Sequence, residues 1–314
     1  MKLLLKVFLC VAALAFTTDA GAADWPDRPI KLIVGFAPGG TADLAVRQAA
    51  PVLSKVLGQP VVVTNLPGSG GGTMAMTLKN SDPDGYTLGI NPSGAFTLNP
   101  LIGAKYTLDD FTFIAGMANF QEGFACKPDR PYNTLAELLD WAKANNQAVN
   151  VAVQSQPERM LLRILSNEHG VKFNMIPTQG GSNAITSLLG DHCDFAFFGG
   201  LHYNYVKTGQ LKCLASAPQT RTKLLPDTPT LAEQGIPFDI SQYLVVAAPK
   251  GLPDAIRSKL DAALNIAVAD SEFVDLLNNK LSMQAMFIDH AMLMQRLQAN
   301  MESYSKMIEL SKEQ

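Results

Sequence analysis

The chain alternates short apolar runs with longer stretches in which apolar residues recur every three or four positions. Short apolar runs bounded by turn residues predict buried strands, and the longer periodic stretches predict amphipathic helices. In one such stretch, Ile256, Leu260 and Leu264 fall on a single helix face. The expected strands are Lys31–Phe36, Pro60–Leu66, Gly85–Asn91, Phe124–Pro128, Val149–Val153, Phe173–Pro177, Asp194–Phe198, Leu211–Ser216 and Tyr243–Ala248. The expected helices are Thr41–Gly58, Gly72–Ser81, Thr134–Asn146, Glu158–Gly170, Ser182–His192, Pro253–Asp270 and a last helix that Asp289 caps and that runs to about Leu310.

This alternation is typical of an α/β fold with mainly parallel sheets. It occurs in two series, which begin near Pro29 and near Phe124 and have no long linker between them. We therefore expect two α/β lobes. A ligand is expected between them, because ligands of open α/β sheets gather at the carboxyl ends of strands. The expected division assigns 23–122 and 242–314 to the first lobe and 123–241 to the second.

The N-terminus has the pattern of a signal peptide. Lys2 and Lys6 precede an apolar run from Val7 to Phe16, and 20–22 (AGA) fits a signal-peptidase site. The apolar run is too short to span a bilayer core of about 30 Å. We expect residues 1–22 to be removed during export and the remaining chain to be a soluble periplasmic protein.

Composition narrows the class of function. The chain is 47% apolar and 17% charged, so a folded protein with a large core is expected and disorder is not. The formal net charge is −3, and no basic field for a nucleic acid is present. We expect no nucleic-acid partner.

Three glycine-containing loops end successive strands of the first series. They span Phe36–Asp43, Pro67–Thr73 and Asn91–Gly94, and the first two lead directly into helices. Glycines allow backbone to approach a ligand closely, and free amides at a helix start attract an anion. These loops therefore favour a small anionic ligand. The alternative is a tight turn in which Asp43 is only an acidic residue of the first helical turn.

The second series ends its strands in polar loops of little charge, Gln154–Arg159 and Thr178–Asn183. They can hold a small polar ligand through neutral donors, and Arg159 can bind a carboxylate through its guanidinium group. The alternative for Arg159 is a solvated charge at a helix start.

Catalytic, metal and cofactor patterns are weak in this sequence. None of the four histidines stands beside a nucleophile motif, and the His192-Cys193-Asp194 neighbours point to different faces of a strand. The glycine loops lack the features of a phosphate-binding or dinucleotide-binding motif. Cys126, Cys193 and Cys213 permit at most one disulfide, with buried free thiols as the alternative. We expect no enzyme activity, no cofactor and no metal.

Six sequence blocks together resemble a known family. They are PIKLIVG (29–35) with FAPGGTAD (36–43), GQPVVV (58–63) with NLPGSGGG (65–72), DGYTL (84–88), PTQGGSNAITSLLGDHCDFAF (177–197), TGQLK (208–212) and LPDTPTLAEQGIP (225–237). Their order and spacing resemble the Bug-type (TctC-like) periplasmic solute-binding proteins of the tripartite tricarboxylate transporter family. The resemblance covers essentially the whole mature chain.

The resemblance implies a type II periplasmic-binding-protein fold, in which two α/β lobes close on a ligand cleft. It also implies binding of a small carboxylate, such as a di- or tricarboxylate, an amino acid or an aromatic acid, and delivery to the transporter's membrane subunits. The expected ligand is thus a small anionic or amphoteric metabolite, and the receptor is expected to be a monomer. Carried over to this sequence, together with the Arg159 prediction, the ligand-binding residues are Phe36, Ala37, Gly40, Thr41, Ala42, Asp43, Ser69, Gly70, Ser93, Gln154, Ser155, Arg159, Thr178, Gln179, Ser182, Asn183 and Asp194.

The sequence departs from the family pattern at several of these positions. Thr41 and Ala42 stand where Gly and Thr are common, Gln154–Arg159 replaces a Ser/Gly-rich turn, and Thr178 replaces a common Tyr. Two other functions stay open from sequence: an extracytoplasmic sensor that feeds a signalling receptor, and, remotely, a periplasmic hydrolase using Ser69 or Ser93.

Overall fold

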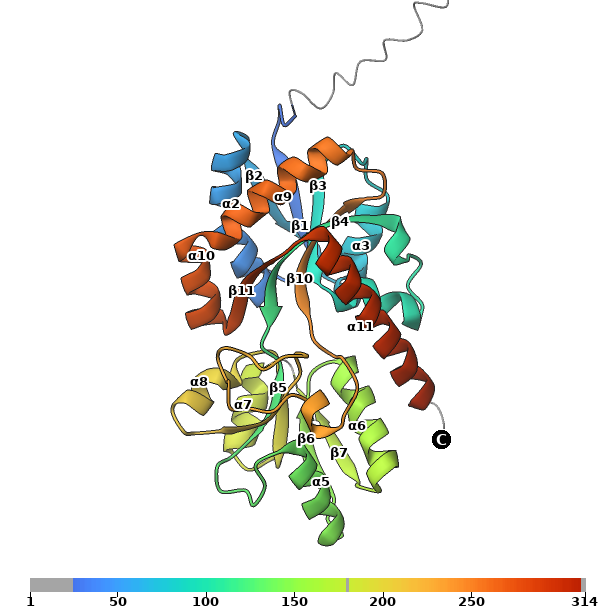
Figure 1. The fold of residues 1–314 in the computed structure, drawn as a ribbon, viewed down its shortest axis with the longest axis vertical. Coiled ribbons are helices and arrows are strands. Elements are labelled where there is room, and N and C mark those ends of the chain that lie inside the picture. The colour runs from blue at the N-terminus through green and yellow to red at the C-terminus, as the bar shows by residue number, and fades with distance from the viewer. Residues whose placement is uncertain (1–24, 179–180, 312–314) are drawn as a thin grey trace, which may run out of the picture.

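Two mixed β-sheets, each flanked by helices, form the molecule (Figure 1). The computed structural model describes residues 25–178 and 181–311, so the expected signal peptide and Gln179 lie outside the described residues. The first sheet has the strand order β11-β4-β10-β3-β1-β2 and the second the order β7-β6-β8-β5-β9. The strands are β1 (Ile30–Val34), β2 (Val61–Asn65), β3 (Thr87–Pro92), β4 (Phe111–Phe120), β5 (Gly123–Cys126), β6 (Val149–Val153), β7 (Phe173–Pro177), β8 (Phe195–Phe198), β9 (Lys212–Ser216), β10 (Tyr243–Pro249) and β11 (Met283–Ile288).

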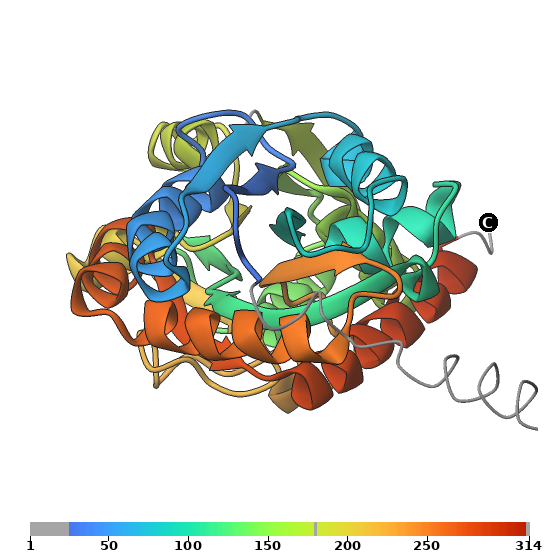
Figure 2. The same ribbon diagram turned by 90° about the horizontal axis from the view of Figure 1, so that it is seen from above.

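Helices cover both faces of the first sheet, as the view from above shows (Figure 2). The described helices are α2 (Thr41–Leu57), α3 (Gly72–Lys79), α4 (Gly94–Thr97), α5 (Leu135–Ala144), α6 (Gln156–His169), α7 (Gly181–Leu189), α8 (His202–Lys207), α9 (Asp254–Ala269), α10 (Ser271–Asp275) and α11 (His290–Leu310), with a π-helical segment at Leu276–Leu281 and short 3-10 segments at Ser69–Gly71, Asn99–Ile102, Leu108–Asp110 and Ala232–Gln234. The side chain of Asp289 caps α11 as expected, accepting a hydrogen bond from the Met292 amide at 2.8 Å. None of the helices in the described ranges is both long and apolar enough to span a membrane.

The sheets are mixed rather than mainly parallel. Each contains a parallel trio, β2-β1-β3 in the first sheet and β7-β6-β8 in the second, as the sequence predicted. The strands next to the two chain crossings, β4, β5, β9 and β10, pair antiparallel with their neighbours. The departure from a mainly parallel sheet thus comes from the strands that carry the chain from one sheet to the other and back.

The strand β4 was not expected from the sequence. Its ten residues are buried almost throughout, and its sequence FTFIAGMANF, with Thr112 and Asn119 as the polar residues, does not alternate apolar and polar positions. A strand that is buried on both faces loses the period-two pattern that identifies half-buried strands. The same analysis missed β11, α4, α8 and α10. By contrast, the bounds expected for β6 and β7 are confirmed.

The chain crosses between the sheets twice, once at Gln121–Glu122 and once in the segment between β9 and β10. These crossings agree with our proposed lobe division of 23–122 with 242–314 and 123–241. The helix α11 reaches both cores: Leu293 and Leu297 pack in a cluster of the first lobe, while Tyr304 and Met307 pack in the main cluster of the second. This helix therefore joins the two lobes by side-chain packing.

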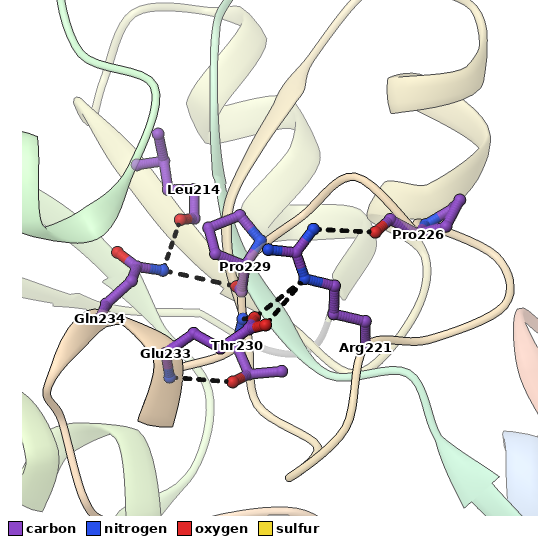
Figure 3. Close-up of polar contacts among 7 residues, drawn as sticks. All are labelled: Leu214, Arg221, Pro226, Pro229, Thr230, Glu233 and Gln234. Atoms are coloured by element: carbon purple, nitrogen blue, oxygen red, sulfur yellow. Dashed lines mark hydrogen bonds and ion pairs between the residues drawn. The ribbon is translucent and has the colours of Figure 1, made fainter.

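The segment between β9 and β10 is fixed to the second sheet by polar contacts (Figure 3). The side-chain amide of Gln234 donates hydrogen bonds to the carbonyl oxygens of Leu214 at 3.0 Å and Pro229 at 3.4 Å. Its side-chain oxygen accepts one from the Ala136 amide at 3.1 Å. Nearby, Glu233 accepts from the Thr230 amide at 2.7 Å, which fixes the short 3-10 turn. These contacts give the 225–237 sequence block a structural role.

Replacing Gln234 with alanine is expected to lower the free energy of unfolding by about 1–3 kcal/mol, because the partly buried Leu214 carbonyl oxygen and Ala136 amide lose this side chain as a partner. Urea unfolding followed by circular dichroism measures this change. The exposed Gln298 on α11 provides the matched control, Gln298→Ala, which is expected to change stability by less than about 0.5 kcal/mol. Equal stability of the two variants would contradict the structural role of Gln234.

Candidate ligand-binding site

A cavity of about 860 Å³ lies between the lobes. Its volume is within the range of small-molecule sites, roughly 300–1,000 Å³. Both lobes and both chain crossings contribute to its wall. The lining residues are Phe36, Ser69, Gly70, Gly72, Pro92, Gly94, Ala95, Leu98, Asn99, Ile102, Gly103, Ala104, Phe120, Glu122, Gln154, Ser155, Gln156, Pro157, Phe197, Gly199 and Gln242.

The first-lobe wall is built at the carboxyl ends of three adjacent strands. Because β1 pairs in parallel with β2 on one side and β3 on the other, their C-terminal ends meet at one edge of the sheet. Phe36 follows β1, Ser69 and Gly70 follow β2, and Gly94 follows β3. The loops that the sequence singled out are therefore brought together at the cavity.

Asn91 fixes two of these loops against each other. Its side chain is fully buried, and its amide donates a hydrogen bond to the Gly71 carbonyl oxygen at 3.1 Å. A Cβ atom on Gly35 would lie 2.1 Å from Asn91 Oδ1, and one on Gly71 would lie 2.5 Å from Nδ2. Gly71 also has a positive φ of 88°. Both positions therefore require glycine. For Gly71 the sequence pattern indicated this close backbone approach, whereas Gly35 lies outside the loops that it singled out.

The start of α3 is the helix start of the first lobe that reaches the cavity. Its N-cap residue Gly71 has no side chain, and the amides of Gly71 and Gly72 donate to the carbonyl oxygens of Gly68 and Ser69 in the preceding 3-10 turn. The N-terminal end of a helix carries partial positive charge. Ser69, Gly70 and Gly72, at the start of α3, line the cavity directly. This edge of the first lobe is thus suited to a carboxylate without any cationic side chain.

The second-lobe wall is polar, but its own side chains already form hydrogen bonds with the backbone amides at the start of α6. Ser155 caps α6, and Glu158 accepts hydrogen bonds from the amides of Gln154 and Ser155 and from the Ser155 hydroxyl group. The side-chain amide of Gln154 donates to the Phe197 carbonyl oxygen. A carboxylate of the protein thus already occupies this helix start. An anionic ligand group is better received by the first lobe.

Gln242, on the second chain crossing, connects the wall to α11. Its side-chain oxygen accepts a hydrogen bond from the Gly94 amide at 2.7 Å, and its side-chain amide donates to the Tyr304 hydroxyl oxygen at 2.6 Å. The Ser93 hydroxyl group also donates to this side-chain oxygen, at 3.3 Å. The polar atoms of Gln242 are therefore used within the protein, where they hold the start of α4 in place.

Glu122, on the first crossing, is the sole charged side chain among the described residues that line the cavity. It is 8% exposed, and its Oε2 atom has no hydrogen-bond partner. Burial raises the pKa of Glu122 well above its usual value, and the charges of Glu158 and Asp239 raise it further, whereas a hydrogen bond from the Gln242 backbone amide opposes this. The cavity therefore contains a buried carboxyl group without a cation.

The predicted site residues divide into two groups. Five of them line the cavity: Phe36, Ser69, Gly70, Gln154 and Ser155. Gln179 lies outside the described residues. The remaining predicted residues do not line the cavity: Ala37, Gly40, Thr41, Ala42, Asp43, Ser93, Arg159, Thr178, Ser182, Asn183 and Asp194.

Several residues of the second group have partners within the protein. Asp43 is 1% exposed and accepts hydrogen bonds from the Gly39 amide at 2.8 Å, the Asn65 side chain at 2.8 Å and Arg47 at 3.0 Å. Burial works to raise the pKa of Asp43, but these hydrogen bonds together hold it below its usual value. Asp43 thus organises the loop after β1. Asp194 likewise accepts from the Asn150 amide at 2.8 Å.

Sequence reasoning missed Glu122 and Gln242, which belong to no local motif. They stand at the two lobe boundaries that the sequence predicted, and this position was the signal that could have found them. The described residues contain no group of three or more His, Cys, Asp or Glu side chains that could hold a metal. Cys126, Cys193 and Cys213 are free, and the first two are buried.

Two α/β lobes with a cavity between them define the class: the chain has a periplasmic-binding-protein fold. A crystal structure of a TctC solute-binding protein from Polaromonas is 29% identical with a TM-score of 0.80, covering 91% of this chain and 99% of the other. The model of the tripartite tricarboxylate transporter family receptor, TctC, matches residues 45–312. The chain belongs to this TctC family of solute-binding receptors, and the resemblance found in the sequence is confirmed.

Curated relatives agree with this assignment. The UPF0065 protein of the gbd 5′ region of Cupriavidus necator is 32% identical over 263 residues, which are 81% of this chain and 79% of that protein. Protein BugT of Bordetella pertussis is 30% identical over 284 residues, 87% of this chain and 86% of its own. At 24% identity, the malate-bound MatC from Rhodopseudomonas palustris shares the fold, with a TM-score of 0.71 and coverage of 90% and 100%.

Asp43→Asn is expected to lower the free energy of unfolding at pH 7 by about 1–3 kcal/mol, because the neutral amide cannot accept all the hydrogen bonds of the carboxylate. The folded-state pKa of Asp43 is depressed, so its contribution is complete at neutral pH and is lost as the pH falls below the usual carboxyl value of 3.8. The difference from the wild type should therefore shrink in acid.

Urea unfolding at pH 7 and pH 3 measures both parts of this prediction. Asp140→Asn, at an exposed position of α5, is the matched control and should leave stability unchanged at either pH. A constant deficit of the Asp43 variant across this pH range would show that ionisation of Asp43 does not stabilise the loop.

Proposed function

We propose that the chain is a periplasmic receptor that captures a small carboxylate-type metabolite and delivers it to the membrane subunits of a tripartite tricarboxylate transporter. The observation that carries this proposal is the cavity between the lobes, with Ser69, Gly70 and the start of α3 on its first-lobe side. Membership of the receptor family supports the transport role. The binding is reversible, and the ligand leaves chemically unchanged.

In this receptor the ligand carboxylate lies against the backbone of Ser69 and Gly70, in the short turn that leads into α3. Helix-start amides stabilise a carboxylate through hydrogen bonds and partial positive charge. Phe36 covers this end of the ligand, while Gln154 and Ser155 approach it from the second lobe. Closure of the lobes around a ligand that contacts both would favour the closed arrangement.

The other predicted site residues enter the proposal differently. Arg159, Thr178, Ser182 and Asn183 contact the ligand only in an arrangement of the lobes in which the second-lobe loops approach it more closely. Asp43, Asp194 and Ser93 act by holding the loops that carry the contacts. We further propose that the receptor works as a monomer and that 1–22 is its cleaved export signal.

Ser69→Asp is expected to weaken binding of any carboxylate ligand by at least about tenfold, because it places a negative charge at the edge that receives the ligand's own charge. Ser69 has a positive φ of 51°, a conformation that Asp and Asn both tolerate. Ser69→Asn is therefore the matched neutral control and should bind within about threefold of the wild type.

Native mass spectrometry and a thermal-shift panel of mono-, di- and aromatic carboxylates and amino acids would identify the ligand. Isothermal titration calorimetry would then give the affinities of the wild type and both Ser69 variants. Equal affinities of the Asp and Asn variants would refute a carboxylate at this loop, and a panel in which no carboxylate binds the wild type would refute the proposed function.

A further inference from the structure

Glu122 has an unusual position for the wall of a carboxylate receptor. It is more than nine-tenths buried and lines the cavity, and its Oε2 atom is without a hydrogen-bond partner. A buried ionised carboxylate is costly unless a cation or several donors accompany it. The protein itself supplies one backbone donor, from Gln242. The protein alone therefore does not supply enough partners to stabilise Glu122 as an ionised carboxylate.

The groups around Glu122 make the missing partner a cation. Glu158 at the start of α6 and Asp239 before β10 both act on it as negative charges, and no cationic side chain of the described residues acts on it appreciably. In the empty cavity, burial and these charges favour the neutral form of the carboxyl group. A ligand group that brought a positive charge would favour the ionised form and form a charge-assisted hydrogen bond.

We propose that Glu122 makes this receptor selective for amphoteric ligands: its carboxylate accepts a hydrogen bond from a protonated nitrogen of the ligand, whose own carboxylate lies at the Ser69–Gly71 loop. This inference rests on the proposed function and narrows its ligand class to amino acids and related ammonium carboxylates. A second ligand carboxylate beside Glu122 would instead add a third negative charge near Glu158 and Asp239. Such repulsion disfavours dicarboxylates in this cavity.

The rest of the wall indicates the shape of such a ligand. Between the helix starts of the first lobe and Glu122, the lining includes Phe120 and Phe197 from the two sheets and Leu98 and Ile102 after α4. Apolar walls with few polar groups favour a ligand that has an apolar body. The structure thus fits an ammonium carboxylate whose carbon skeleton packs on these side chains.

Binding of matched probes to the full mature chain tests the proposal by isothermal titration calorimetry. Three compounds share a six-carbon skeleton and differ at one end: 6-aminohexanoate, hexanoate and adipate. Two further pairs differ by the amino group alone: L-leucine with 4-methylpentanoate and L-phenylalanine with 3-phenylpropanoate. At least one amphoteric probe is expected to bind at least about tenfold more tightly than its counterpart without nitrogen, and adipate is expected to bind no more tightly than hexanoate.

Glu122→Gln keeps the size of the side chain and removes its charge. It is expected to weaken binding of the preferred amphoteric probe by about tenfold or more and to change binding of the counterpart without nitrogen by less than about threefold. Glu302→Gln, at an exposed position of α11, is the matched control and should behave like the wild type. Unchanged discrimination in the Glu122 variant would overturn the proposal.

A measurement on the wild type keeps the test independent of the variant's folding. An ammonium group that binds Glu122 lowers the pKa of its carboxyl group, so titrations at a series of pH values between 5 and 8, each in two buffers of different ionisation enthalpy, should reveal proton release with amphoteric probes in part of this range and none with hexanoate. Absence of proton release, or tighter binding of hexanoate or adipate than of 6-aminohexanoate and both amino acids, would overturn the role of Glu122 and leave the carboxylate receptor intact. Failure of every carboxylate probe would contradict the proposed function itself.

Discussion

The contact between the Asn91 side chain and the backbones of Gly35 and Gly71 is the constraint on which the binding edge depends. Asn91 is the next-to-last residue of β3, Gly35 follows β1, and Gly71 precedes α3. A hydrogen bond to the Gly71 carbonyl oxygen and close packing on Gly35 leave no space for a side chain at either glycine. Three strand ends are thereby fixed at one place, and the turn at Ser69 and Gly70 keeps a defined position on the cavity wall.

An asymmetry between the lobes follows from the way their helices begin. In the first lobe, α3 starts after Gly71 and has no side-chain cap, whereas the Asp43 carboxylate in the first turn of α2 accepts a hydrogen bond from the Gly39 amide. In the second, α6 starts with a Ser155–Glu158 capping box, so a carboxylate of the protein already uses its first amides. Residues 154–159 are one of the places where the sequence departs from the family pattern, and the capping box gives this departure a physical meaning. The start of α6 offers polar surface and negative charge rather than an anion site.

The sequence predicted the features that depend on local pattern. The two α/β series, the bounds of β6 and β7, and the loops that follow β1, β2 and β3 all come from apolar periodicity and glycine spacing. The sequence could not show in which direction a polar side chain points. The Asp43 side chain faces Arg47 and Asn65, and Asn65 lies 22 residues further along the chain. Glu122 and Gln242 stand 120 residues apart and meet the cavity only because the chain crosses twice between the sheets. No local motif records that meeting.

These two crossings connect ligand recognition to the arrangement of the lobes. Gln242 joins the Gly94 amide in the first lobe to Tyr304, and Tyr304 packs in the core of the second. Glu122 adds the one charged group of the described wall at the other crossing. A ligand can shift the balance between lobe arrangements only by the difference in its affinity for them. A ligand that contacts the crossings touches the segments that connect the two lobes. A charge pair between Glu122 and the ligand would therefore affect the segments that set the relative arrangement of the lobes. Selection of the ligand and the lobe arrangement presented for delivery can therefore depend on one interaction.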